Sequence, residues 1–451
     1  MKTDNNFLWG INSSSFQCEN DLHLGDRGPS IWDDCTSVYP GLKGVDIEKG
    51  PRYIQHIDED IKLLKELGVK CYRLSLSWTR IIPDGIGKVS EFGVKLYQDW
   101  IKKLIDNGIT PYVNLFHWDY PLALEKLGGW KNPDSPKWYA YYASVVGKMF
   151  DGLVKDYIVY NEPQCFTELA YNLGIKAPFE HLQRDQILDI IHNSLVAGAL
   201  ACKELRKASS IKLNIGVAET FNPAFPDDEN NPEDVKLAME YNDKFHEDYY
   251  FVLDWFADPA YLGTYPEDYL RVNKFKRDPK ECYADFDFIG LNIYTGKRIK
   301  AIDGKPVVIH RDGVYRNQMD WECEPECMYW GIKYAHEKYH KPIIVTESGT
   351  SCDDKLIDGK VHDQDRITYI NDYLSEVLRA KEDGCDVRGY FVWSFTDNFE
   401  WELGYKIRIG LVYIDYEDNA KRYKKDSYYF FQDVIKNNAS NLAKKKLPFN
   451  L

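Results

Sequence analysis

The chain alternates short runs of β-branched and aromatic residues with longer segments of helical period, and this alternation most constrains its fold. We predict eight strands, at residues 7–15, 70–78, 111–118, 157–161, 212–219, 286–294, 342–347 and 387–395. Amphipathic stretches that predict helices lie at 53–67, 92–105, 136–150, 184–207, 236–256, 326–339, 364–383 and 424–436. Repeated strand–helix units are typical of a parallel sheet covered by helices.

Eight such units predict an α/β fold, a single (β/α)8 TIM barrel with long βα-loop insertions, in which residues 1–451 form one domain. Such barrels take about 250 residues and exceed about 400 when their βα loops carry insertions. Segments 19–50 and 295–325 are the expected insertions. The alternative is an open, doubly wound sheet, but no G-x-G-x-x-G sequence follows any of the strands.

Charge and cysteine usage exclude several classes of protein. The 57 Lys and Arg residues against 71 Asp and Glu residues leave a net charge of −14, which works against binding to nucleic acid. No stretch approaches the roughly 18 apolar residues of a membrane span, and residues 7–11 are too short for the apolar core of a signal peptide. Ten scattered cysteines favour reduced thiols, so we expect a cytoplasmic protein.

Polar and aromatic side chains collect where the predicted strands end, which is where barrel enzymes place their active sites. Carboxylates and amides can bind adjacent hydroxyls, and a tryptophan face can cover the C–H face of a ring, so this mixture suits a neutral sugar. No glycine-rich loop is present to hold phosphate. The strand-end residues are Gln17, Arg73, His117, Asn161, Glu162, Asn292, Tyr294, Glu347, Trp393, Glu400 and Trp401.

Two of these carboxylates, Glu162 and Glu347, follow the fourth and seventh predicted strands, which the barrel would bring to opposite walls of one pocket. Two facing carboxyl groups are the requirement for glycoside hydrolysis, one protonated through burial and one ionised beside Arg and Tyr donors. Taken alone, Glu162 also fits the start of a helix and Glu347 a turn. Their occurrence at two strand ends of one barrel favours catalysis.

A zinc site is the main competing interpretation. Cys323, Cys327, His336 and His340 form C-x3-C-x8-H-x3-H, but the central gap is short against the usual dozen or so residues. A metal-dependent hydrolase using His117 and Asp119, and a protein that binds sugar without cleaving it, are further alternatives. We expect no metal and no cofactor.

Several stretches together resemble glycoside hydrolase family 1, the β-glucosidase family, nearly from end to end. They are FLWG from Phe7, FQCE from Phe16, DRGPSIWD from Asp26, CYRLSLSWTRIIP from Cys71, HWDYP from His117, YNEP from Tyr160, TESG from Thr346 and DNFEWELGY from Asp397. The last four are the most specific. Departures from the family pattern are Tyr157, Val159, Ile293, Cys327 and Ser348, and they bear on the preferred sugar.

The resemblance implies a retaining β-glycosidase, with a β-glucosidase favoured, in which Glu162 is the acid/base and Glu347 the nucleophile. It implies that Arg73 and Tyr294 hold the nucleophile and that Asn292 lies in the same layer. It assigns the following residues to the substrate: Gln17, His117, Asn161, Trp393, Glu400 and Trp401 to the sugar, and Trp321 to the leaving group.

The expected partner is a small β-glycoside, and a homo-oligomer is compatible with the sequence. Galacto- or fuco-configured substrates remain alternatives. A 6-phospho-β-glycosidase is disfavoured because the Glu400 carboxylate would repel phosphate, although Lys406 lies nearby in sequence. A sugar-binding protein without activity is disfavoured because both carboxylates are kept.

Overall fold

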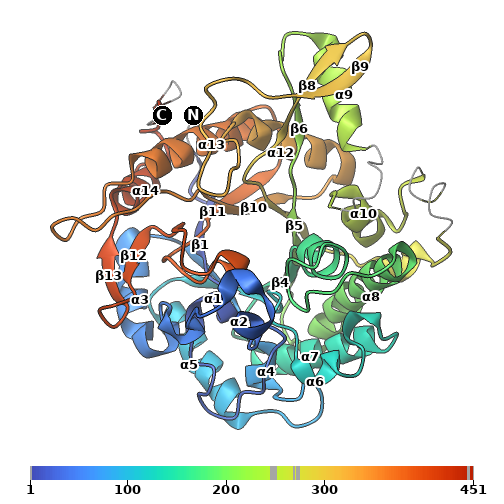
Figure 1. Cartoon of the computed structure of the whole chain (residues 1–451), viewed down its shortest axis with the longest axis vertical. Helices are drawn as coiled ribbons and strands as arrows, with labels where there is room; N and C mark the ends of the chain where they lie inside the picture. Colours follow the sequence, from blue (N-terminus) through green and yellow to red (C-terminus); the bar gives the residue numbers. More distant parts are fainter. Residues whose placement is uncertain (1–2, 244–250, 268–269, 271–274, 444–446, 450–451) are drawn as a thin grey trace.

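The computed structural model describes residues 3–243, 251–267, 270, 275–443 and 447–449. Eight parallel strands close into a barrel in the order β1-β11-β10-β7-β5-β4-β3-β2 (Figure 1). Each strand overlaps a predicted one, which confirms the predicted (β/α)8 barrel. The strands are β1 (Leu8–Asn12), β2 (Cys71–Ser75), β3 (Thr110–Asn114), β4 (Asp156–Asn161), β5 (Asn214–Thr220), β7 (Phe288–Asn292), β10 (Ile343–Ser348) and β11 (Val387–Val392).

Amphipathic helices surround the barrel, and local signals mark their ends. The Ser90 side chain accepts a hydrogen bond from the Gly93 amide at the start of α5, and α3 ends at Gly68, whose φ of 85° suits glycine. The longer helices are α3 (Tyr53–Leu67), α5 (Glu91–Asp106), α7 (Ser135–Met149), α8 (Arg184–Ala208), α9 (Pro232–Asn242), α12 (Glu326–Tyr339), α13 (Gln364–Glu382) and α14 (Asp426–Lys436). Short ones are α1 (Ser15–Glu19), α2 (Cys35–Val38), α4 (Trp78–Ile81), α6 (Leu122–Glu125) and α10 (Asp254–Ala257).

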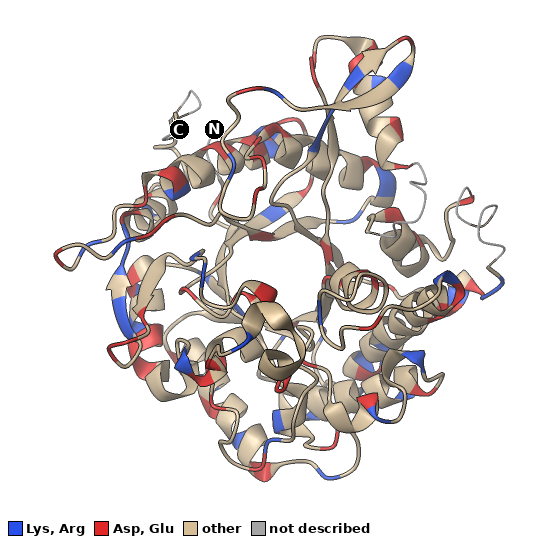
Figure 2. Cartoon of the chain, in the orientation of Figure 1, with Lys and Arg blue, Asp and Glu red and all other residues tan. Residues whose placement is uncertain are grey.

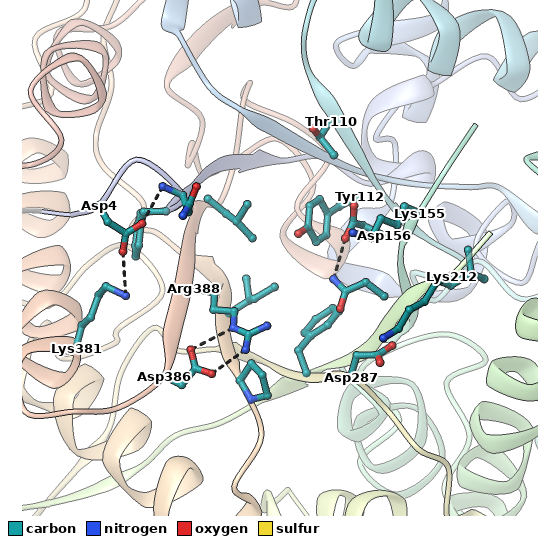
Figure 3. Close-up of a pocket in the computed structure, with 18 residues that line it drawn as sticks. Asp4, Thr110, Tyr112, Lys155, Asp156, Lys212, Asp287, Lys381, Asp386 and Arg388 are labelled. Atoms are coloured by element: carbon teal, nitrogen blue, oxygen red, sulfur yellow. Dashed lines mark hydrogen bonds and ion pairs between the residues drawn. The ribbon is translucent and has the colours of Figure 1, made fainter. Parts of the chain in front are cut away.

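The amino-terminal end of the barrel is filled by apolar side chains. One buried layer consists of Cys71, Tyr112, Ile158, Ala218, Phe288, Ile344 and Phe391. Outside it lies a depression of about 940 Å³ lined by charged residues (Figure 3). Its charges include ion pairs such as Asp4 with Lys381 at 3.5 Å and Asp386 with Arg388 at 2.9 Å. Packed apolar side chains therefore close this end of the barrel, and its surface carries paired charges of both signs.

Three regions differ from the predicted elements. The predicted helix 236–256 is wrong: α9 ends at Asn242, α10 occupies Asp254–Ala257, and residues 244–250 lie outside the described part of the chain. α9 packs through Leu237 on a small separate sheet, and at its end the Asn242 side chain accepts a hydrogen bond from the backbone amide of Ala224 at 2.8 Å, which ties the end of the helix to that sheet.

That sheet occupies part of the predicted insertion at 295–325. It joins β6 (Ala224–Pro226), β8 (Lys297–Ile302) and β9 (Lys305–Ile309), and it projects from the barrel together with α9 (Figure 1). A further hairpin, β12 (Val412–Asp415) with β13 (Lys421–Lys424), precedes α14. The insertion at 19–50 holds only short elements, α2 and two 3-10 turns.

Charged residues of both signs are interspersed over the outer helices and loops (Figure 2). In the parts of the chain that the structure describes, no helix is long and apolar enough to cross a membrane.

Candidate active site

A pocket of about 290 Å³ opens at the carboxyl ends of the barrel strands, and most of the predicted site residues line it. Gln17, Arg73 and Asn292 lie behind its wall and hydrogen-bond to residues that face it. The predicted residues on the wall are His117, Asn161, Glu162, Tyr294, Trp321, Glu347, Trp393, Glu400 and Trp401.

Irregular strand ends aim the two central carboxyl groups into this pocket. The register of β4 against β5 shifts between Ile158 and Asn161, immediately before Glu162. The register of β10 against β7 shifts between Val345 and Glu347. Such bulges redirect side chains at the rims of barrels. Both glutamates therefore lie where the regular alternation of side chains along their strands is interrupted, at the edge of the site.

Glu347 is bound by two donors that favour its charged form. One of its oxygens contacts the Arg73 guanidinium, and the Tyr294 hydroxyl donates to the other at 2.7 Å. Glu347 is only 3% exposed. Burial raises the pKa of Glu347, while Arg73 and Tyr294 oppose that rise.

Glu162 has no cation in direct contact among the residues that the structure describes. The Asn292 amide donates to its Oε1 at 2.8 Å, and the Cys165 thiol lies 3.0 Å from its Oε2. Burial raises the pKa of Glu162, and those two hydrogen bonds oppose the rise only in part. Because Arg73 contacts Glu347 directly and reaches Glu162 only through Asn161 and Asn292, we assign the proton shared within this pair to Glu162.

Asn161 connects the two carboxyl groups. Its oxygen accepts from Arg73 at 2.6 Å and from Asn292 at 2.9 Å, so its amide nitrogen faces Nε2 of His117 at 3.0 Å. Nε2 must then accept, which leaves the ring proton on Nδ1, 3.2 Å from the Ser75 hydroxyl. Burial, with the Arg73 charge, lowers the pKa of His117 well below its usual value. His117 is therefore a neutral imidazole.

Glu400 and the aromatic residues form another wall of the pocket. The Gln17 amide lies 3.5 Å from Glu400 and donates to the Phe399 carbonyl at 3.0 Å. The ring of Trp393 lies beside His117, with centroids 5.6 Å apart. Glu400 is exposed only in part, and its burial in the protein raises its pKa to about 8 although the Lys176 cation opposes this.

Sequence reasoning missed several residues of the pocket. Lys176 pairs with Glu402 inside it, and its ammonium lies 5.0 Å from the Trp118 ring centroid. A lysine in a loop gives no periodic signal, so only the fold reveals it.

Lys406, which the sequence placed near the site, is instead exposed and donates to the Gly41 carbonyl. The end of β5 and the residues after it supply Thr220 and Asn222 to the wall, and the helical segment after β4 supplies Cys165.

Three residues of the pocket wall hold strained backbone conformations. Trp118, Glu162 and Trp401 have φ angles of 80°, 47° and 42°, in the left-handed region that favours glycine. Each such residue costs about 1–3 kcal/mol and persists only where its surroundings hold it. Non-glycine residues of this kind are typical of functional sites.

No zinc site forms from the cysteine and histidine residues of the C-x3-C-x8-H-x3-H sequence. Across the described residues, no group of three or more His, Cys, Asp or Glu side chains could hold a metal ion. Cys323 and Cys327 are buried as free thiols, and α12 places His336 and His340 at its last turn and end.

Comparison with known proteins gives one consistent result. Residues 2–440 match the family described as glycosyl hydrolase family 1. The chain is 36% identical to β-glucosidase A of Thermotoga maritima, over 96% of this chain and 97% of that protein. It is 33% identical to β-glucosidase A of Acetivibrio thermocellus, over 96% and 98%. The solved structure of a Thermotoga maritima β-glucosidase in complex with glucoimidazole superposes with a TM-score of 0.88 at 35% identity, covering 97% of this chain and 99% of that one.

Proposed function

This chain belongs to glycosyl hydrolase family 1, and from that premise we propose that it is a β-glucosidase that cleaves short β-glucosides by a retaining double displacement. The observation that carries the mechanism is the pair of buried carboxyl groups at the ends of β4 and β10, with unequal partners. Glu347, held by Arg73 and Tyr294, acts as the nucleophile. Glu162, which no cation contacts among the described residues, acts as the acid and then as the base.

In the first step, Glu347 attacks the anomeric carbon while Glu162 gives its proton to the leaving oxygen. The bond to the leaving group breaks and a glycosyl ester on Glu347 forms. Neutralising Glu347 removes a negative charge beside Glu162, so the pKa of Glu162 falls.

In the second step, the ionised Glu162 takes a proton from water, whose oxygen attacks the anomeric carbon. The ester bond to Glu347 breaks, and the sugar leaves with the configuration it had at the start. Two inversions at one carbon give net retention.

The remaining polar residues of the pocket would bind the sugar, and Trp321 would border the leaving group on the side of Tyr294, 5.4 Å away between ring centroids. Asn161 has one amide N–H beyond the one directed at His117, and Glu400 can accept, so the wall offers both donors and acceptors to hydroxyl groups. The residues we assign to the sugar are Gln17, His117, Asn161, Trp393, Glu400 and Trp401.

A neutral sugar is favoured over a sugar 6-phosphate. Lys176 is the lysine on the pocket wall, and its charge is already paired with Glu402. Glu400 adds a further acidic group, so a phosphate would meet more acidic than basic neighbours.

We also propose a cytoplasmic location. The ten cysteines support it, because all are unpaired and buried, as expected in a reducing compartment.

The test compares wild type with Glu347→Gln on an aryl β-glucoside, with proton NMR of the first product formed. We expect β-glucose first and a loss of more than about a thousandfold in kcat for the variant. Asp156→Asn, at the opposite end of the barrel, should stay within about twofold of wild type. Comparable turnover by Glu347→Gln would remove the nucleophile assignment, and α-glucose as first product would remove the retaining mechanism.

A panel of glycosides tests the substrate. We expect glucosides to be cleaved faster than galactosides or fucosides, and 6-phosphorylated glucosides slowest. Binding without turnover across the whole panel would identify a sugar-binding protein instead.

A further inference from the structure

The thiol of Cys165 contacts the carboxyl group to which we assign the acid and base roles. Its sulfur lies 3.0 Å from Oε2 of Glu162, while the Asn292 amide occupies Oε1. Cys165 is 4% exposed and begins the π-helical segment η4 (Cys165–Asn172) that follows Glu162. Its amide also donates to the Glu162 carbonyl at 2.9 Å, which fixes the thiol relative to the carboxyl group.

The two partners act differently on the two protonation states. Asn292 donates through an N–H in both states, so Oε1 remains an acceptor and the acid proton must sit on Oε2. A thiol donates weakly to an ionised oxygen and accepts only weakly from a protonated one. The contact at Oε2 therefore favours the ionised form of Glu162.

We propose that Cys165 is a positioning residue for the second half of the reaction, in which its S–H donates to Oε2 of ionised Glu162 and holds that carboxylate as the base toward water. The proposal rests on the function proposed above. It needs the sulfur to remain a thiol, and burial, followed by the neighbouring Glu162, raises the pKa of Cys165 well above its usual value.

Other charged and titratable groups face Glu162 from other positions of the chain, and a change at residue 165 removes none of them. The cations among these groups lower the pKa of Glu162, and the carboxyl groups raise it. Because the variants at residue 165 keep all of these groups, the change in the pKa of Glu162 reports the loss of the thiol. These groups are Arg73 on β2, Lys176 after η4, Glu219 on β5, Tyr294 after β7, Glu347 on β10 and Glu400 after β11.

The test reads the pKa of Glu162 in two states of the enzyme. With an alkyl β-glucoside, whose leaving group needs a proton, the basic limb of kcat/KM reports Glu162 in the free enzyme. With 2,4-dinitrophenyl β-glucoside, whose leaving group needs none, the second step limits kcat and its acidic limb reports Glu162 in the glycosyl-enzyme.

Cys165→Val keeps the approximate volume and removes the donor, so the ionised form loses support and the pKa of Glu162 rises. Both limbs should then move to higher pH, by about half a unit to one unit. At a pH on the acidic limb, below the pKa of Glu162, kcat for the dinitrophenyl substrate should fall by roughly threefold to tenfold. Cys165→Ser restores a donor and should return both limbs toward wild type. If the valine variant does not fold, Cys165→Ala provides the same comparison.

Cys202→Val, a buried thiol on α8, is the matched control and should leave both limbs unmoved. The proposal is overturned if neither limb moves in Cys165→Val, or if the serine variant shifts as far as the valine variant. A failure of the proposed function looks different, because wild type would then be inactive or Glu347→Gln would keep its turnover.

Discussion

At the scale of the residue, identical side chains differ in chemistry because their contacts differ. Glu162 and Glu347 are both buried glutamates at strand ends, yet only Glu347 contacts a guanidinium. Glu400 lies in the segment after β11 and is exposed in part, and the burial of its carboxyl group in the pocket raises its pKa to about 8. The residue type and its position were predictable from strand-end motifs. The partners Cys165 and Lys176 were not, because no spacing rule relates them to the carboxyl groups that they approach.

Removing the Tyr294 hydroxyl should shift the pH dependence of activity. Tyr294 donates to Glu347 at 2.7 Å and opposes the rise in the pKa of Glu347 that burial causes. In Tyr294→Phe that pKa rises further. Glu347 must be ionised to attack, so the acidic limb of kcat/KM should move to higher pH by about half a unit to one unit. The basic limb, which reports Glu162, serves as the internal control, and an unmoved acidic limb would contradict the prediction.

Lys176 should support the charge of Glu400. It is the cation that most opposes the raised pKa of Glu400, and it also pairs with Glu402. In Lys176→Met we expect more of Glu400 to be protonated at neutral pH, because its pKa rises further. The carboxyl group then binds sugar hydroxyls less well, so KM should rise by roughly threefold to tenfold. Lys176→Arg retains the charge and is the control, and equal KM values for all three proteins would refute the role.

At the scale of the element, a buried ionic network holds the segment that follows β11. Lys425 is fully buried and contacts Asp354 and Asp397, and the amide of Gly410 donates to Asp397 at 3.1 Å. Asp397 begins the stretch that carries Glu400 and Trp401 into the pocket. The network therefore connects the start of α14 to a wall of the site.

Breaking that network should destabilise the protein strongly. Lys425→Met leaves the carboxylates of Asp354 and Asp397 buried with one cation fewer. We expect the free energy of unfolding, measured by urea titration, to fall by about 3–5 kcal/mol. Lys421→Met on β13 removes a lysine whose side chain is 56% exposed and should cost less than about 1 kcal/mol. Equal losses in the two variants would show that the network contributes little.

The elements that sequence reasoning missed divide into two kinds. The β8–β9 hairpin turns at Asp303 and Gly304, both with positive φ, and Asp-Gly between apolar runs is a strong hairpin signal that could have identified it. The β12–β13 hairpin turns through Asn419 and Ala420, also at positive φ, without a glycine to mark it. α9 ends at Asn242, whose side chain contacts the Ala224 backbone on β6, and no local pattern encodes that contact.

At the scale of the whole molecule, closing the barrel separates two tasks. Apolar side chains fill the amino-terminal end, paired charges line the depression outside it (Figure 3), and the pocket lies at the other end. The eight-strand barrel was predictable because each strand–helix unit carries its own periodic signal. The small sheet was not predicted as a unit, since β6 lies far in sequence from the β8–β9 hairpin with which it pairs.

That residues 1–451 form one domain stays a prediction, and thermal unfolding can test it. If one domain accounts for the chain, calorimetry should show a single transition whose calorimetric and van't Hoff enthalpies agree. A glucosidase inhibitor should move that whole transition to higher temperature. Two transitions, with only one shifted by the inhibitor, would contradict it.

The left-handed backbone at Trp118, Glu162 and Trp401 has an evolutionary consequence. Glycine at any of these positions would relieve the conformational strain, and at Glu162 it would also remove a buried acidic group. At Trp118 and Trp401, glycine would also delete a buried aromatic ring, which costs about 3–5 kcal/mol and so exceeds the strain relieved. Selection for thermal resistance alone would thus retain the two tryptophans, and only the proposed catalytic role of Glu162 accounts for an acidic side chain at its strained position.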